Sequence, residues 1–168
     1  MELQYRLLTP GEQWPADPAS LAAAISSQGH FQPDVEIAGD RLRVRDAAHG
    51  LTSMARLEPY APETYESLLA GATYAPRMTD RDRETALPFH RQVTITTGAG
   101  PETNAASQAL FHASVADGIW WLMGGFLADP YRHTLWGWRR WRGDQPLTDH
   151  ATETAAHLPA NPTEGGPR

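Results

Sequence analysis

The residues best suited to bind a partner lie near the end of the sequence, between positions 129 and 143. If this segment is a helix, Trp136 lies on its polar side with arginines one turn before and one turn after it. These neighbours are Arg132, Arg139 and Arg140. Tryptophan and arginine are enriched at interface hot spots, and both stack on nucleic-acid bases. The cluster predicts a partner-binding surface, against the alternative that Trp136 is covered and the arginines only stack on it.

A second group of cations follows the periodicity of a β-strand. Arg41, Arg43 and Arg45 are spaced by two residues, so they lie on one face of a strand while Leu42 and Val44 lie on the other. This pattern predicts an anion- or nucleic-acid-binding surface on the open face of a sheet. The alternative is a solvated face whose arginines pair with Glu36 across the hairpin.

A glycine-containing turn, "TITTGAGPETN", joins a predicted strand to a predicted helix over residues 94–104. Gly98 and Gly100 could let backbone N–H groups approach a phosphate at the helix start. The dinucleotide-binding fingerprint fails, because its third glycine would fall at Thr103, and the chain has no lysine for a P-loop. The glycines are equally explained by the turn alone.

No residue pattern predicts a metal, a cofactor or a catalytic centre. The seven histidines are scattered, there is no cysteine, and the acidic residues at 80, 82 and 84 alternate with arginines. An enzyme would need a pocket near residues 98–104, lined by His90, His112 or Asp117. That possibility stays open, while a non-enzymatic domain is favoured.

The composition is that of a globular chain of 168 residues with a net charge of −6. The longest uncharged apolar stretch, residues 118–128, is shorter than the roughly 20 residues that span a bilayer, so no membrane span is expected. The N-terminus lacks a secretory signal, which favours a cytoplasmic location. We expect one domain over residues 1–143 and a proline-rich, disordered tail over residues 144–168.

The apolar periodicity predicts an α+β fold with an antiparallel or mixed sheet and helices mainly on one face, an elaborated ferredoxin-like sandwich. Expected strands cover residues 3–7, 51–57 and 119–123, with a hairpin over residues 35–46 that turns at Gly39 and Asp40 and a further strand within residues 89–100. Expected helices cover residues 17–29, 62–72, 79–87, 101–117 and 130–142, and Gly118 is expected to end the fourth of them. A strand over 134–142 is the alternative for the last helix, against the capping signals of Asp129 and Pro130.

The second half of the chain resembles a group of uncharacterised bacterial α+β proteins, some found beside toxin–immunity genes. The resemblance covers about residues 89–129, with "TGAG", an alanine-rich helix, "DGIWWLMGG" and "FLAD" in that order. It implies a protein-binding role of an immunity or accessory type, and it assigns no functional residue.

The leading hypothesis is therefore a domain that binds another protein, or a second copy of itself, through the surface of helix 130–142. Trp136 would be an exposed anchor, supported by Arg132, Arg139 and Arg140. The alternative is binding of single-stranded nucleic acid or a phosphate ligand by the same residues together with Arg41, Arg43 and Arg45.

Overall fold

The computed structural model describes residues 3–14, 17–27, 29–60, 63, 75–77, 84 and 89–136. Two helices and eight strands have defined bounds in these ranges. In chain order they are β1 (Gln4–Thr9), α1 (Pro18–Ser26), β2 (Asp34–Ala38), β3 (Arg41–Asp46), β4 (Leu51–Pro59), β5 (Ala75–Arg77), β6 (Arg91–Ala99), α4 (Ala105–Met123), β7 (Phe126–Asp129) and β8 (Thr134–Trp136).

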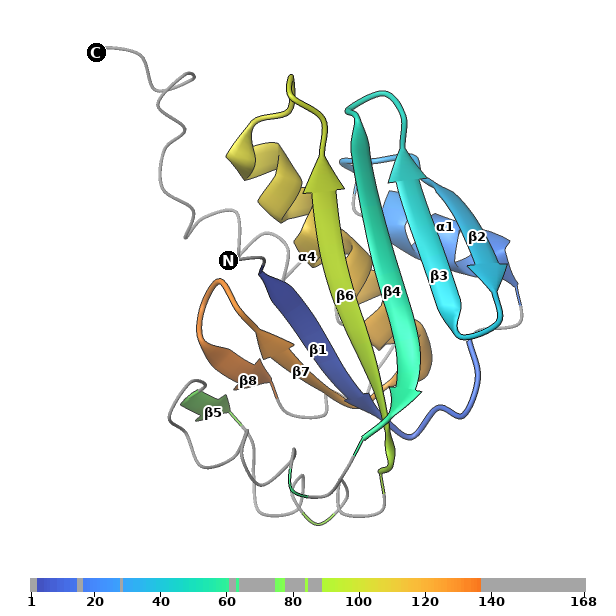
Figure 1. Ribbon diagram of the computed structural model, residues 1–168, viewed down its shortest axis with the longest axis vertical. Helices are drawn as coiled ribbons and strands as arrows, with labels where there is room; N and C mark the ends of the chain where they lie inside the picture. Colours follow the sequence, from blue (N-terminus) through green and yellow to red (C-terminus); the bar gives the residue numbers. More distant parts are fainter. Residues whose placement is uncertain are drawn as a thin grey trace.

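The strands form one sheet in the order β2-β3-β4-β6-β1-β7-β8-β5. All neighbouring strands run antiparallel except β5, which pairs in parallel with β8 at the edge. Both helices lie behind the sheet in Figure 1, α1 behind β2 and β3 and α4 behind β4, β6 and β1. The predicted α+β class, with helices on one face of the sheet, is confirmed.

Strict alternation of residue type produces the two layers. In β3 and β4 the residues facing the helices are buried, and those between them are mostly exposed. The core between the layers joins Leu42, Val44 and Ile95 of the sheet to Leu21 and Phe111 of the helices. This apolar layer fixes which face of each strand remains open.

The connectivity elaborates the ferredoxin-like pattern. That pattern has two strands between its two helices, whereas here β2, β3, β4 and β6 form a meander of four between α1 and α4 in the sheet. The predicted hairpin with its turn at Gly39 and Asp40 is confirmed, as are the strand beginning at residue 51 and the first helix. The side chain of Asp17 caps that helix by accepting a hydrogen bond from the backbone N–H of Ala19 at 2.9 Å.

The sequence predicted a strand over residues 119–123. The structure shows instead that these residues form the C-terminal end of α4. An apolar run without periodicity fits a buried helix as well as a buried strand. Gly118, expected to end the helix, instead lies inside it where α4 crosses α1. A Cβ atom at this position would lie 2.9 Å from Cγ1 of Ile25, so the glycine permits the close approach of the two helices.

The helix predicted from residue 130 is also absent over the described positions 130–136. A turn over residues 130–133 leads into β8, whose Trp136 pairs with Leu127 of β7. The Asp129 carboxylate accepts hydrogen bonds from the backbone N–H groups of Tyr131 and Arg132 at 2.9 and 3.2 Å. An aspartate followed by proline starts a β-turn as readily as a helix, which explains the wrong prediction.

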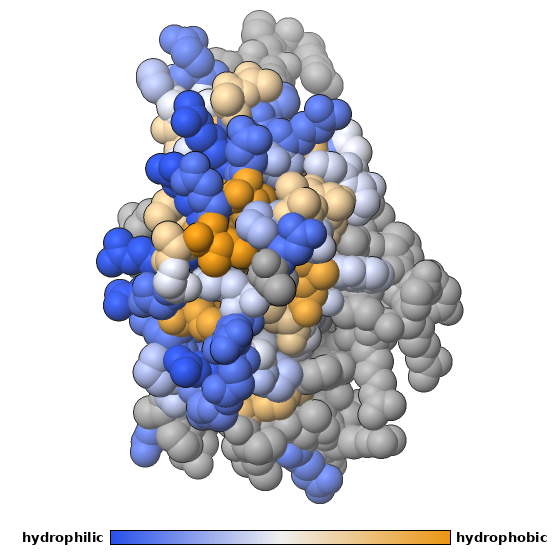
Figure 2. Space-filling model, turned by 90° about the vertical axis from the view of Figure 1, so that its right-hand side faces the viewer, coloured by the Kyte–Doolittle hydropathy of each residue, from blue (hydrophilic) through white to orange (hydrophobic). Residues whose placement is uncertain are grey.

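Strand β2 is one edge of the sheet. Its Val35 and Ile37 face the helix layer but are only half-buried, because no further strand lies beyond them. The view from this side shows hydrophobic residues, in orange, grouped in the middle among hydrophilic residues, in blue (Figure 2). The β2 edge is therefore the less completely covered end of the apolar layer.

Several predictions lie outside the described residues. These are most of the helices expected at 62–72 and 79–87, the segment from 137 onward with Arg139 and Arg140, and the tail 144–168. Within the ranges that are described, neither helix combines the length and apolar character needed to cross a bilayer.

Candidate functional site

The arginine row predicted from the sequence lies on the open face of the sheet. Arg41, Arg43 and Arg45 are all exposed, while Leu42 and Val44 between them are fully buried. Arg43 forms an ion pair with Glu36 on the neighbouring strand, as one of the two interpretations had expected. Among the described residues no ion pair involves Arg41 or Arg45. Two of the three cations thus remain able to receive an outside carboxylate or phosphate.

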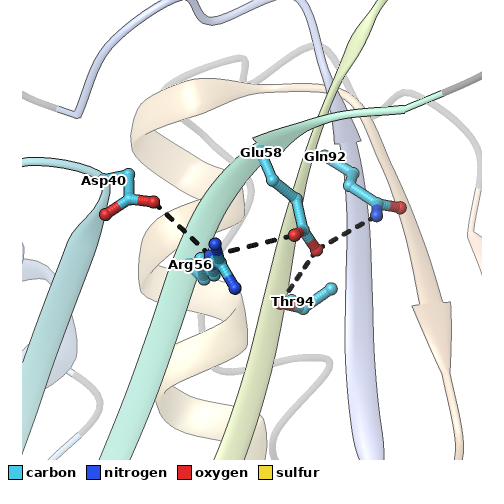
Figure 3. Close-up of polar contacts among 5 residues, drawn as sticks. All are labelled: Asp40, Arg56, Glu58, Gln92 and Thr94. Atoms are coloured by element: carbon cyan, nitrogen blue, oxygen red, sulfur yellow. Dashed lines mark hydrogen bonds and ion pairs between the residues drawn. The ribbon is translucent and has the colours of Figure 1, made fainter.

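A polar network continues this face across β4 and β6 (Figure 3). Arg56 lies with its Nε 3.4 Å from Asp40 and 3.9 Å from Glu58. Gln92 and Thr94 donate to the same Glu58 carboxylate, at 3.2 and 3.5 Å. Because these side chains contact one another, their positions on this part of the face are fixed by interactions within the protein.

Met54 lies in the middle of the open face and is 41% exposed. Its cross-strand neighbours are Arg43 on β3 and Thr96 on β6. An exposed, flexible apolar side chain among arginines and hydroxyls is typical of a protein interface, where methionine and arginine are both enriched. Met54 and Arg56 were not among the residues predicted from the sequence. The signal was present, because Thr52, Met54 and Arg56 alternate with the apolar residues of the same strand.

The structure places Trp136 inside the molecule. Its side chain is 4% exposed, and its indole Nε1 donates to the buried Asp129 carboxylate at 3.4 Å. The guanidinium of Arg132 lies 4.7 Å from the centre of the tryptophan ring. The expectation of an exposed anchor is therefore wrong, because β8 pairs with β7 where a free helix had been expected. The alternative, a covered tryptophan with a stacked arginine, describes the observed contact.

Backbone polar groups of the glycine turn around Gly98 and Gly100 form hydrogen bonds within the protein. The N–H of Gly100 donates to the carbonyl of Gly50 at 2.9 Å, and the N–H of Thr103 donates back to Gly100 at 3.1 Å. The Asn104 side chain caps α4 by accepting from the N–H of Ser107 at 2.7 Å. These contacts support the interpretation of the glycines as turn residues, and they leave fewer donors for a phosphate.

A cavity of about 470 Å³ does lie beside this turn, but a different histidine lines it. His49 takes the place where His90, His112 or Asp117 had been expected. Its Nδ1 lies 3.1 Å from the buried carboxylate of Asp46, which is the arrangement of a base and its orienting acid. Within the described ranges no hydroxyl group forms a hydrogen bond with the His49 ring, so the pair lacks a nucleophile.

His112 is buried between α4 and the sheet. Its Nε2 lies 2.8 Å from the carbonyl of Ile95, and its Nδ1 lies 2.9 Å from the hydroxyl of Tyr131. A carbonyl can only accept, so Nε2 carries the proton and Nδ1 accepts from Tyr131. Burial lowers the pKa of His112 to about 4, although the Ile95 hydrogen bond and the charge of Asp129 oppose the shift. Burial, and then Asp129, raise the pKa of Tyr131 to about 12.

Both groups of this pair are therefore neutral near neutral pH and hold the helix to the sheet. No trio of acidic or histidine side chains in the described part of the chain is arranged to hold a metal ion. In the comparisons with known proteins, no family model, no curated protein and no solved structure matches the chain.

Proposed function

We propose that the chain is a binding domain that docks another protein on the open face of its sheet, around Met54. The observation that carries the proposal is the exposure of Met54, 41%, within a ring of arginine and hydroxyl side chains. Hot spots in interfaces consist of a central anchor surrounded by polar contacts that exclude water. The candidate docking surface is therefore the open face of the sheet and no longer the helix predicted over residues 130–142.

The charges of the face favour an acidic protein as the partner. The strands that form it carry Arg6, Arg41, Arg43, Arg45 and Arg56 against Asp34, Glu36 and Glu58, in a chain whose net charge is −6. Arginines Arg41 and Arg45 would pair with carboxylates of the partner. Two copies of the chain would instead bring the same arginine row together, so a different protein fits better than self-association.

Single-stranded nucleic acid is the second candidate, supported by the same arginine row. Domains that bind nucleic acid on a sheet face stack bases on aromatic side chains of those strands. The described outward positions of β2, β3, β4 and β6 carry no aromatic residue, and Glu36 and Glu58 would repel phosphates. The protein partner is therefore preferred.

The test compares two exposed apolar residues of similar exposure. Met54→Asp removes the anchor, and Leu3→Asp, at a position 43% exposed, serves as the matched control. We expect nuclease-treated extracts of the source cells to yield one stoichiometric partner with the wild type and with Leu3→Asp, and not with Met54→Asp. Equal capture by both variants would contradict the proposal. Loss of the partner on nuclease treatment would favour nucleic acid, and dimerisation in sedimentation would favour self-association.

A further inference from the structure

A second site lies on the helix-facing side of the sheet, at the opposite end from the glycine turn. It is a cavity of about 590 Å³ between the β1–α1 loop, the β2–β3 turn and the first residues of β6. In Figure 1 the loop that leaves β1 passes below the β2–β3 turn on its way to α1. Cavities of roughly 300 to 1,000 Å³ are the size that takes a small organic ligand.

The cavity has apolar walls. Ile37, Leu57 and Pro18 contribute aliphatic surface from β2, β4 and the start of α1. Trp14 contributes an indole ring that is 9% exposed and belongs to the hydrophobic core. Walls of this kind hold the carbon body of a ligand.

Two of the residues that line the same cavity each carry a buried hydrogen-bond donor. The indole Nε1 of Trp14 and the Nε of Arg91 are both inaccessible to solvent, and neither has a hydrogen-bond partner among the described residues. Both atoms can only donate. A buried donor without a partner is energetically unfavourable, so a ligand that supplies acceptor oxygens to it would be bound more tightly.

Arg91 is unusual in its place on the sheet. It starts β6 and precedes Val93 and Ile95 by two and four residues, so it shares their helix-facing side. A partly buried arginine in phase with buried aliphatic residues requires a reason beyond solubility. The acidic groups on the rim of the cavity already have partners, because Asp40 lies 3.4 Å from the guanidinium of Arg56 and Glu12 lies 2.8 Å from the His90 ring.

We propose that this cavity binds a small organic molecule with one carboxylate and an apolar body. The carboxylate would accept hydrogen bonds from Arg91 and Trp14, a charge-assisted arrangement in a site of low polarity. Its apolar body would lie against Ile37, Leu57 and Pro18. A ligand with a single negative charge matches the one guanidinium that the described part of the chain contributes to the cavity lining, that of Arg91. The site does not include Met54 or the arginine row, and it is linked to the open face through Asp40, which contacts Arg56.

The test uses two probes that share one carbon body, 4-phenylbutyrate and 4-phenylbutylamine. Each is titrated into the ¹⁵N-labelled full chain, and the indole N–H signal of Trp14, assigned by its loss in Trp14→Phe, is followed by NMR. We expect saturable binding of the acid with a large shift of this signal, and no saturation with the amine. Inorganic phosphate is expected to leave the signal in place.

Two arginine variants test which cation binds the carboxylate of the ligand. Arg91→Met keeps an aliphatic stem and is expected to weaken 4-phenylbutyrate binding about tenfold or more. Arg41→Met, on the open face, is the matched control and should leave the affinity unchanged. Equal binding of acid and amine, no shift of the Trp14 signal, or an unchanged affinity in Arg91→Met would each overturn the proposal. If Arg91→Met does not fold, the comparison of the two probes on the wild type decides alone.

Discussion

The two ends of the sheet differ in the exposure of their side chains. In β2 and β3 exposed residues alternate with residues facing the helices, whereas all residues of β7 and β8 are buried. The first end therefore offers one face to solvent, and the second is covered on both. The same residue types have different roles at the two ends, since Arg41 and Arg45 are exposed while Arg132 stacks on buried Trp136.

This difference shows that an arginine beside an aromatic residue does not by itself indicate a binding surface. Where a strand alternates strictly, its polar residues must face away from the core. Where alternation is missing, only the packing of neighbouring segments decides exposure. Candidate docking residues are accordingly better sought on β2, β3 and β4 than on β8.

The largest expected effect distinguishes the two ends by stability. Trp136→Ala should lower the free energy of unfolding by about 3–5 kcal/mol, because it removes a buried aromatic side chain. Met54→Ala, on the open face, should change it by less than about 0.5 kcal/mol. Urea denaturation at neutral pH measures both. Similar small losses in the two variants would mean that Trp136 is not buried in solution.

The second effect, nearly as large, is a pH dependence of stability that arises from the buried His112. The unfolded chain protonates His112 near pH 6.5, whereas the folded protein holds it neutral down to about pH 4. Stability from this residue is therefore complete above pH 6.5 and is lost as the pH falls toward 4. The linked loss is about 3 kcal/mol, from about 1.4 kcal/mol per pH unit.

His112→Gln provides the control for this effect. Unfolding free energies of both proteins are measured at several values between pH 7 and pH 4. We expect the variant to be less stable at pH 7 and to approach the wild type as the pH falls. Parallel curves over this range would contradict the assignment of a buried neutral histidine.

The smallest expected effect lies on the open face. Glu36→Gln removes the charge that pairs with Arg43, and both side chains are about half-exposed or more. Exposed ion pairs contribute about 0–1 kcal/mol, so the urea midpoint should hardly move. A loss above about 1.5 kcal/mol would show that this pair is coupled to the core, and would weaken the contrast between the two ends.

The accuracy of the sequence predictions follows the same division. The alternation of Leu42 and Val44 with arginines located β3 and its exposed face correctly, because one side of the strand contacts the core and the other contacts water. Trp120 and its neighbours gave no such contrast, since every side of that segment is apolar. A run of this kind cannot distinguish a helix from a strand.

The same capping signal, an aspartate before a proline, predicted a helix correctly at one of its two positions. Asp17 before Pro18 starts a helix, as predicted, and Asp129 before Pro130 starts a turn. Both carboxylates accept backbone N–H groups in the same local way. The difference arises beyond the turn, where β8 pairs with β7.

The cavity at Arg91 likewise depends on one feature visible in the sequence and on another that only the fold supplies. Arg91 is in phase with Val93 and Ile95, so the sequence contains the anomaly, but only the fold brings it to one cavity with Trp14. These two residues lie far apart in the chain and on different elements.

The sequence by itself determined the α+β class, the first hairpin and the exposure of its arginines, because these depend on local periodicity and turn chemistry. Tertiary structure alone decided the burial of Trp136, the length of α4, the central position of Met54 and the cavity at Arg91. These depend on contacts between segments distant in the chain, which no local pattern encodes.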